Sequence, residues 1–286
     1  MAVDTPQRYR ARSVSVARAA KAMGIVAVVV YCLAPMYWMV VSSLRRTADI
    51  FDNSFFPQPL SLENYVDVFN PANNFGRALL NSCVVAGSVT ILTLVISVLS
   101  SYALTRFTFR GRGFILAFII TASMFPAIAL VVPLLRLFTD VGWINTYQAM
   151  IVPSMSFSLP LAVFTLTSFF RQMPLDLEHA AMLDGCTRTR AFFSVVLPLA
   201  APAVFTTAIL VFIASWNEYI IALAMTNKPD VQTATVAVSF FTGATGRDTP
   251  FGTQMAAGVL LTVPLLIAVL LFQRRIVAGL TAGSIK

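Results

Sequence analysis

Five neighbouring residues with polar or aromatic side chains interrupt a long apolar stretch: Ser215, Trp216, Asn217, Glu218 and Tyr219. Asn217 and Glu218 supply hydrogen-bonding groups, and the two aromatic rings supply flat apolar faces. A sugar presents hydroxyl groups and C–H faces that match both, so the cluster suits a path for a sugar. A hydrogen bond to a neighbouring helix, or an aromatic anchor at a membrane interface, explains the same residues equally well.

A polar insert at 171–198 is the second candidate, because it separates two long apolar stretches. Pro174 favours the first turn of a helix, where its missing N–H would have no partner in any case. Asp176 and Glu178 then meet the positive end of the helix dipole. The insert is therefore predicted to contain a helix, either as a docking site for another protein or as part of a solvated loop.

The sequence also predicts where the helix in the insert ends. Ala180 and Ala181 leave one face thin, and Gly185 can adopt the left-handed conformation that closes a helix. A second short segment that carries Arg188 and Arg190 is predicted to stop at Pro198.

Composition places the chain in a membrane, since 58% of its 286 residues are apolar and only 11% are charged. A spanning helix needs about 20 predominantly apolar residues. Six stretches meet this length: 22–43, 78–105, 113–135, 141–170, a part of 201–226, and 250–272. The first is too long and too far from the start for a cleavable signal peptide, so we interpret it as a retained span.

The predicted fold class is therefore an all-α membrane protein with six transmembrane helices. We expect a loosely ordered polar segment at 1–21, a membrane domain at 22–272 and a tail at 273–286. Glu218 is the single charged residue inside any predicted span, and a charge at that depth costs at least ~2.5 kcal/mol. Its side chain must face the helix bundle or a watery cavity.

Basic residues indicate the orientation, because cytoplasmic flanks retain Lys and Arg. With both termini inside, the cytoplasmic segments carry 14 basic residues: Arg8, Arg10, Arg12, Arg18, Lys21, Arg106, Arg110, Arg112, Arg171, Arg188, Arg190, Arg274, Arg275 and Lys286. The other side carries six: Arg45, Arg46, Arg77, Arg136, Lys228 and Arg247. The net charge of +8 fits contact with anionic lipid, and no pattern suggests nucleic acid.

Several chemistries lack the residues that they need. The three cysteines are far apart and His179 is the single histidine, so no metal site, disulfide framework or catalytic triad is predicted. The chain has no phosphate-binding loop, so it binds no ATP or Mg itself, and any ATPase must be a separate polypeptide. A membrane enzyme is disfavoured for the same reasons, and an ion-coupled transporter usually buries more ionisable groups than Glu218 alone.

The loops carry local signals of their own. Ser61 is expected to cap a short helix in the loop 44–77, and loop 227–249 has some strand character in its VQTATVAVSFF run. Prolines lie inside several predicted spans and indicate bent helices, either as simple kinks or as the lining of a path that opens alternately.

The insert resembles the coupling signature of ABC importer permeases. That signature is a Glu-Ala-Ala triplet, three residues, Gly, nine residues, then aliphatic-x-Leu-Pro. The matching residues are Ala180, Ala181, Gly185, Val195, Leu197 and Pro198. The glutamate of the triplet is His179 here, and Glu178 is displaced by one residue. The outer Glu-Asn-Tyr run at 63–65 and the Trp-Asn-Glu cluster also resemble permeases of maltose-type carbohydrate importers, and mycobacterial trehalose importers are the nearest likeness.

The resemblance implies a smaller six-span permease that works with a second permease, a dimer of ATPase subunits and an extracytoplasmic sugar-binding protein. It assigns coupling to the ATPase to Glu178, His179, Ala180, Ala181, Asp184, Gly185 and Pro198. It places a tail near the ATPase: Gly279, Leu280, Thr281, Ala282 and Gly283. Trehalose, another di- or oligosaccharide such as maltose, and a pore-completing role without sugar contacts all remain open.

Overall fold

A computed structural model describes the backbone of residues 7–241 and 250–281. The chain divides into two compact units, one made of Met1–Val68 and Gly243–Val259, the other of Phe69–Thr242 and Leu260–Lys286. Helix α12 (Phe251–Thr281) contributes its first residues to the first unit and the remainder to the second.

The first unit is built on the long helix α1 (Gln7–Ser43), followed by a 3-10 turn (Thr47–Asp49) and α2 (Glu63–Val68). Because α1 begins at Gln7, it includes most of the segment that we expected to be loosely ordered. The predicted cap is confirmed, since the backbone N–H of Glu63 donates to Ser61 Oγ at 3.2 Å. Asn64 fixes the loop by donating to the carbonyls of Ser43 and Arg45.

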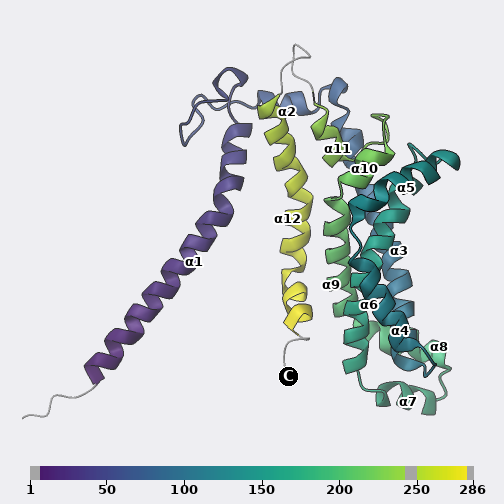
Figure 1. Ribbon diagram of the computed structural model, residues 1–286. Coiled ribbons are helices and arrows are strands. Elements are labelled where there is room, and N and C mark those ends of the chain that lie inside the picture. Colours follow the sequence, from purple (N-terminus) through teal and green to yellow (C-terminus); the bar gives the residue numbers. More distant parts are fainter. Residues whose placement is uncertain (1–6, 242–249, 282–286) are drawn as a thin grey trace, which may run out of the picture. The chain divides into compact units, whose positions relative to one another are not determined.

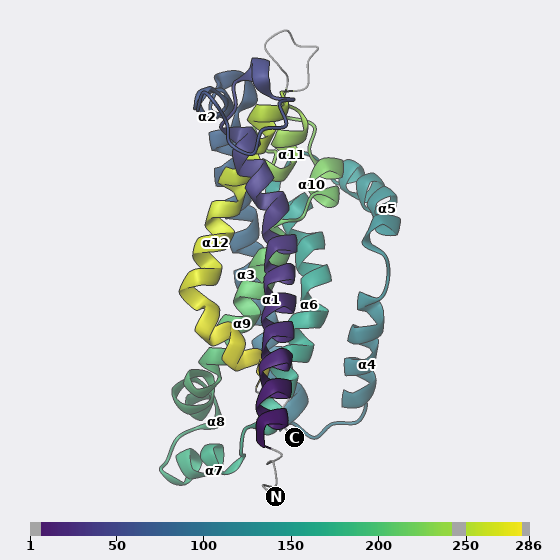
Figure 2. The same ribbon diagram turned by 90° about the vertical axis from the view of Figure 1, so that its left-hand side faces the viewer.

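Three long helices form the frame of the second unit: α3 (Phe75–Arg106), α6 (Tyr147–Gln172) and α9 (Leu197–Trp216). They run side by side in both views (Figure 1 and Figure 2). Shorter helices complete the unit: α4 (Arg112–Ser123), α5 (Ala127–Asp140), α7 (Asp176–Leu183), α8 (Arg188–Ala191), α10 (Ile220–Met225) and α11 (Ala234–Ser239), with a 3-10 turn at Pro71–Asn73.

In the part of the chain that the structure describes, five helices are long and apolar enough to cross a membrane, or six if α4 and α5 count as one span. The expected continuous third span is wrong in detail, because α4 and α5 meet at 91° (Figure 2). Pro126 lies at the break, where it supplies no N–H and disfavours the helical conformation of Phe125.

The start of the fourth span also differs from the prediction. The fourth span begins at Tyr147 and not at 141, because Gly142 and Asn145 adopt positive φ angles of 71° and 62° in a turn. Asn145 Oδ1 accepts hydrogen bonds from the N–H groups of Asn227 and Lys228, at 2.8 and 3.0 Å. These bonds are far apart in sequence, so hydropathy alone could not locate the turn.

The sequence predicted that the short segment with Arg188 and Arg190 stops at Pro198. In the structure the helix continues past this residue. A π-helical stretch (Phe192–Val196) joins α8 to α9 without interruption. Pro198 directly follows the π stretch, so the change in helical hydrogen bonding lies beside the residue that supplies no N–H.

The strand expected in loop 227–249 is a helix, α11. Ser82 Oγ accepts a hydrogen bond from the N–H of Ala234 at 2.9 Å, and Asn81 donates to the carbonyls of Asp230 and Gln232 at 3.0 and 2.8 Å. These contacts with α3 satisfy the backbone around the start of α11, so tertiary packing overrides the β propensity of its Val and Thr residues.

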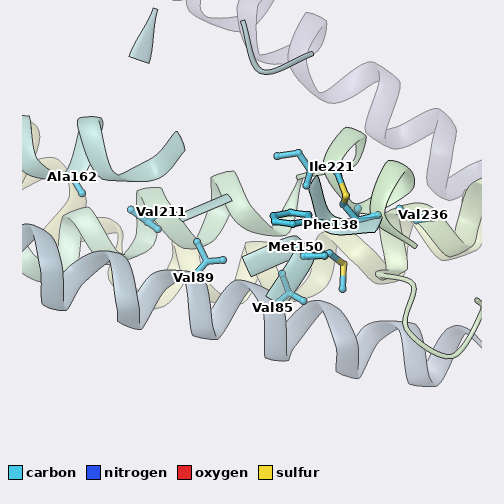
Figure 3. Close-up of a cluster of buried hydrophobic side chains, with 11 residues drawn as sticks. Val85, Val89, Phe138, Met150, Ala162, Val211, Ile221 and Val236 are labelled. Carbon is cyan, nitrogen blue, oxygen red and sulfur yellow. The ribbon is translucent and has the colours of Figure 1, made fainter. Parts of the chain in front are cut away.

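A buried apolar cluster holds the second unit together (Figure 3). Val85 and Val89 of α3 face Met150 of α6, Val211 of α9 and Ile221 of α10. This packing fixes the α9–α10 junction, and therefore the residues at 216–219, relative to α6.

Candidate functional site

Helix α7 ends as the sequence predicted. Gly185 has a φ of +87°, and its N–H donates to the Met182 carbonyl at 3.1 Å, while the N–H of Cys186 donates to the Ala181 carbonyl at 3.0 Å. This pair of bonds is the Schellman motif, which satisfies carbonyls at the end of a helix. A Cβ atom at Gly185 would meet nothing within 4 Å, so backbone conformation alone favours glycine here.

One face of α7 is exposed at the end of the bundle (Figure 1). His179, Ala180, Asp184 and Gly185 are exposed, and Ala181 is half-buried. Leu183, the last residue of α7, is 88% exposed although it is apolar. The residues predicted to contact another protein are thus accessible, except for Glu178, and Leu183 joins them.

Glu178 points the opposite way and is buried. Its Oε1 accepts a hydrogen bond from Nε of Arg106 at 2.5 Å, and its Oε2 accepts one from the Tyr102 hydroxyl at 2.9 Å. Both oxygens are therefore used inside the chain, at the end of α3. This differs from the prediction for Glu178, because the carboxylate is not presented to another subunit.

The other arm of the insert also contacts the end of α3. Thr187 caps α8, since its Oγ1 accepts a hydrogen bond from the N–H of Arg190 at 3.3 Å. The guanidinium of Arg188 lies 5.3 Å from the ring centre of Phe107, a cation–π contact. Glu178 of α7 and Arg188 of α8 thus both contact residues at the end of α3.

The polar cluster at 216–219 lies where α9 gives way to α10. Glu218 accepts hydrogen bonds from the N–H groups of Ile221 and Ala222, at 2.8 and 2.9 Å, and so caps α10. Asn217 is exposed and donates to the Ile213 carbonyl at 2.8 Å, and Tyr219 is also exposed. The break in the fifth span is as predicted, but Glu218 stands at a helix start and not inside a helix.

The side chain of Trp216 does not lie beside that of Glu218. Its side chain is buried, it stacks on Phe212, and its Nε1 donates to the Leu261 carbonyl of α12 at 3.2 Å. The indole packs against α12, so the structure gives no support to the stacking face for a sugar predicted at Trp216.

A cavity of about 210 Å³ opens between α5, α6, α9 and α10. Its polar lining consists of Ser154 and Ser158 of α6, Ser215 of α9, and Glu218. Ser215 is 7% exposed, and its Oγ has no hydrogen-bond partner among the described residues. Ser215 belongs to the polar cluster noted in the sequence, whereas Ser154 and Ser158 were not singled out, because only the packing of α6 against α9 brings them beside it.

The predicted tail is described only in part. The backbone of Gly279, Leu280 and Thr281 continues α12, and Ala282 and Gly283 lie outside the described residues. Among the residues that the structure describes, no group of three or more His, Cys, Asp or Glu side chains could hold a metal ion.

A comparison with protein families decides the identity of this chain. Residues 93–281 match the model of the binding-protein-dependent transport system inner membrane component. The chain belongs to this family. It is therefore an ABC importer permease, and its curated relatives identify sugars as the class of cargo.

Two relatives of the permease are named for the transport of trehalose, and a third is named for the transport of sulfoquinovosyl glycerol. The trehalose/maltose transport system permease protein MalG of Thermococcus litoralis is 42% identical over 265 residues, which are 92% of this chain and 95% of the relative. The trehalose transport system permease protein SugB of Mycobacterium tuberculosis is 40% identical over 259 residues, covering 91% and 94%. The sulfoquinovosyl glycerol transport system permease protein SmoH of Agrobacterium fabrum is also 40% identical, covering 89% of each chain.

The solved structures agree on the fold of the permease. A chain of a bacterial ABC transporter involved in the import of the acidic polysaccharide alginate superposes with a TM-score of 0.76. The two share 19% of their residues, over 96% of the permease and 99% of that chain. This identity supports a common fold and no closer relation.

Proposed function

We propose that this permease forms half of the translocation path of an ATP-driven disaccharide importer, with trehalose as its cargo. Two curated relatives named for trehalose support this choice. The names of other relatives, for sulfoquinovosyl glycerol and for diacetylchitobiose, make those sugars the first alternatives to test. Both termini are cytoplasmic in this proposal, with α7 on the same side.

The cavity beside Glu218 is the observation that carries the sugar path. Its serine hydroxyls and its carboxylate can donate to and accept from sugar hydroxyls, and its remaining lining is apolar: Ala127, Phe157, Leu161, Leu210, Val211, Ala214 and Ile221. Its volume of about 210 Å³ is below the range of roughly 300–1,000 Å³ that ligand pockets occupy. One chain therefore supplies part of the path, and a second permease completes it.

The exposed face of α7 serves as the contact with the ATPase in this proposal. ATP and Mg are bound by a separate dimer of ATPase subunits, and an extracytoplasmic binding protein delivers the sugar. A solved alginate ABC transporter in complex with a sugar-bound periplasmic protein supports this type of assembly. The ATPase acts on the sugar path only if nucleotide binds the inward- and outward-facing states with different affinities.

Reconstitution of the permease with its partner subunits tests the substrate. We expect ATP-dependent uptake of trehalose into proteoliposomes, in excess of uptake of maltose or diacetylchitobiose. In the variant Ser215→Ala, the KM for trehalose should rise about 3- to 10-fold, because one hydrogen bond to the sugar is lost.

The control is Ser156→Ala, since Ser156 is exposed on α6 and its hydroxyl donates to the Val152 carbonyl of its own helix. Uptake of another sugar in place of trehalose would refute the cargo. An unchanged KM in Ser215→Ala would leave the permease a pore-completing role without sugar contacts.

A further inference from the structure

The buried contact of Glu178 with α3 has no part in the function proposed so far. The side chains of Glu178 and Arg106 are 6% and 5% exposed. By contrast, the ion pair between Arg77 and Asp230 spans 3.8 Å between side chains that are largely in solvent. Removal of one partner from a buried pair leaves an uncompensated charge, so the loss of either side chain should disturb the contact between α7 and α3.

The ion pair between Arg106 and Glu178 is part of a larger network of contacts. Arg106 also donates from Nη2 to the Met173 carbonyl at 3.1 Å, directly after the end of α6. The Tyr102 ring lies 4.6 Å from Phe192 and 6.1 Å from Phe107, centre to centre. Hydrogen bonds and ring contacts thus connect α3, the end of α6, α7 and the π-helical stretch at one point.

Helix α3 also makes polar contacts near its other end, where Asn81 is located. Asn81 donates to the carbonyls of Asp230 and Gln232, and its Oδ1 accepts a hydrogen bond from the Tyr147 hydroxyl at 2.8 Å. Helix α3 is therefore tied to the insert at one end and to the 229–234 loop at the other. A displacement of α7 can reach the far end of the bundle along a single helix.

We propose that Glu178 is a positioning residue for coupling: with Arg106 and Tyr102 it fastens the α7 insert to α3, so that α7 and α3 move as one body. The inference rests on the proposed function, in which α7 docks on an ATPase. It assigns the two sides of α7 to different tasks. His179, Leu183 and Asp184 face the ATPase, and Glu178 transmits the movement of the helix to the membrane.

Spin labels on the full-length permease test the attachment without any ATPase. The labels are placed on Leu183 and Leu99, both exposed, after Cys32, Cys83 and Cys186 are replaced by Ser. Glu178→Gln and Glu178→Ala should broaden the distance distribution about two-fold, because the insert separates from α3. Tyr102→Phe, which keeps the ring and loses the hydroxyl, should have a smaller effect of the same kind.

Sugar imported per ATP hydrolysed by the reconstituted complex is the second measurement. Glu178→Gln should lower this ratio roughly 2- to 30-fold, the range for one link in a coupling network, while ATP is still hydrolysed. Arg106→Gln should do the same, and the double variant should lose less than the two single losses combined. Asp176→Asn is the matched control, since it removes an exposed acid from the same turn and should change neither measurement.

The outcomes separate the two proposals. Narrow distances in Glu178→Gln and Glu178→Ala, with an unchanged import-to-ATP ratio, would overturn the role of Glu178. Failure of the wild-type insert to bind any ATPase would overturn the proposed function, and the spin-label distances would still decide whether Glu178 fastens α7 to α3.

Discussion

At the scale of single residues, the side chains of α7 lie in two different environments. Glu178 and His179 are neighbours in sequence, yet the first is buried against α3 and the second is exposed. His179 stands where the family signature has a glutamate, so the exposed side of α7 presents an imidazole in place of a carboxylate. The acid of the insert has an internal partner instead.

Gly185 provides the first prediction at this scale. Gly185→Val should lower import per complex several-fold, because its φ of +87° costs a residue with a Cβ atom about 1–2 kcal/mol and would shift the end of α7. Gly185→Asn should retain most of the import, since Asn tolerates this conformation. Equal import by Gly185→Val and the unmodified permease, measured per purified complex, would contradict this account.

At the scale of elements, α3 is a central helix of the second unit, with contacts to α6, α9 and α11. It packs against α6 and α9 along its length, and it carries polar ties at both ends. The third span contrasts with it, because α4 and α5 bend by 91° at Pro126 and present mainly exposed apolar residues. Within the second unit, α3 is therefore a packed helix, whereas α4 and α5 expose most of their apolar side chains.

Asn81 tests the outer tie of α3. Asn81→Leu removes the donor to the carbonyls of Asp230 and Gln232, and we expect the loss of about 1–3 kcal/mol of local stability. Amide hydrogen exchange of residues 229–236 should accelerate roughly ten-fold as a result. Thr90→Val is the control, because Thr90 donates only within α3, to the Ala86 carbonyl. Unchanged exchange in Asn81→Leu would show that packing alone holds this loop.

At the scale of the whole molecule, the distribution of charge and apolar surface indicates how the permease sits in a membrane. Six arginines belong to the loops and helix ends on the α7 side of the second unit: Arg106, Arg110, Arg112, Arg171, Arg188 and Arg190. In α1, only 6% of the most apolar window is buried in this chain. Such a surface is compatible with lipid or with a second permease, and not with water.

Cysteine labelling tests the proposed orientation. In a variant without native cysteines, a membrane-impermeant maleimide should label Leu183→Cys only in inside-out vesicles, and Phe56→Cys only in right-side-out vesicles. Both side chains are exposed, at 88% and 69%, so access does not limit the reaction. Added ATPase should protect position 183 and not position 56. The reverse pattern would place α7 outside the cell and refute the proposed contact.

Local signals in the sequence were sufficient for much of this protein. Five of the stretches predicted from hydropathy overlap the five helices that are long and apolar enough to cross a membrane, because the bilayer requires long apolar helices. The bounds agree within two residues for 22–43 and 250–272, whereas the helical stretch of the fifth span begins at Arg188, before the predicted 201. Ser61 and Gly185 predicted helix ends correctly, since caps and left-handed turns depend on neighbouring residues. Pro174 did not, because it lies before α7, which begins at Asp176, and not in the first turn of that helix. The family signature in the insert was readable for the same reason.

Only the tertiary structure decided how those elements are used. It replaced the expected strand by α11, bent the third span, turned Glu178 toward Arg106 and gathered Ser154, Ser158 and Ser215 around one cavity. Each of these results depends on contacts between residues far apart in the chain. Propensity and periodicity describe a segment alone, whereas burial and pairing depend on which other segment it meets.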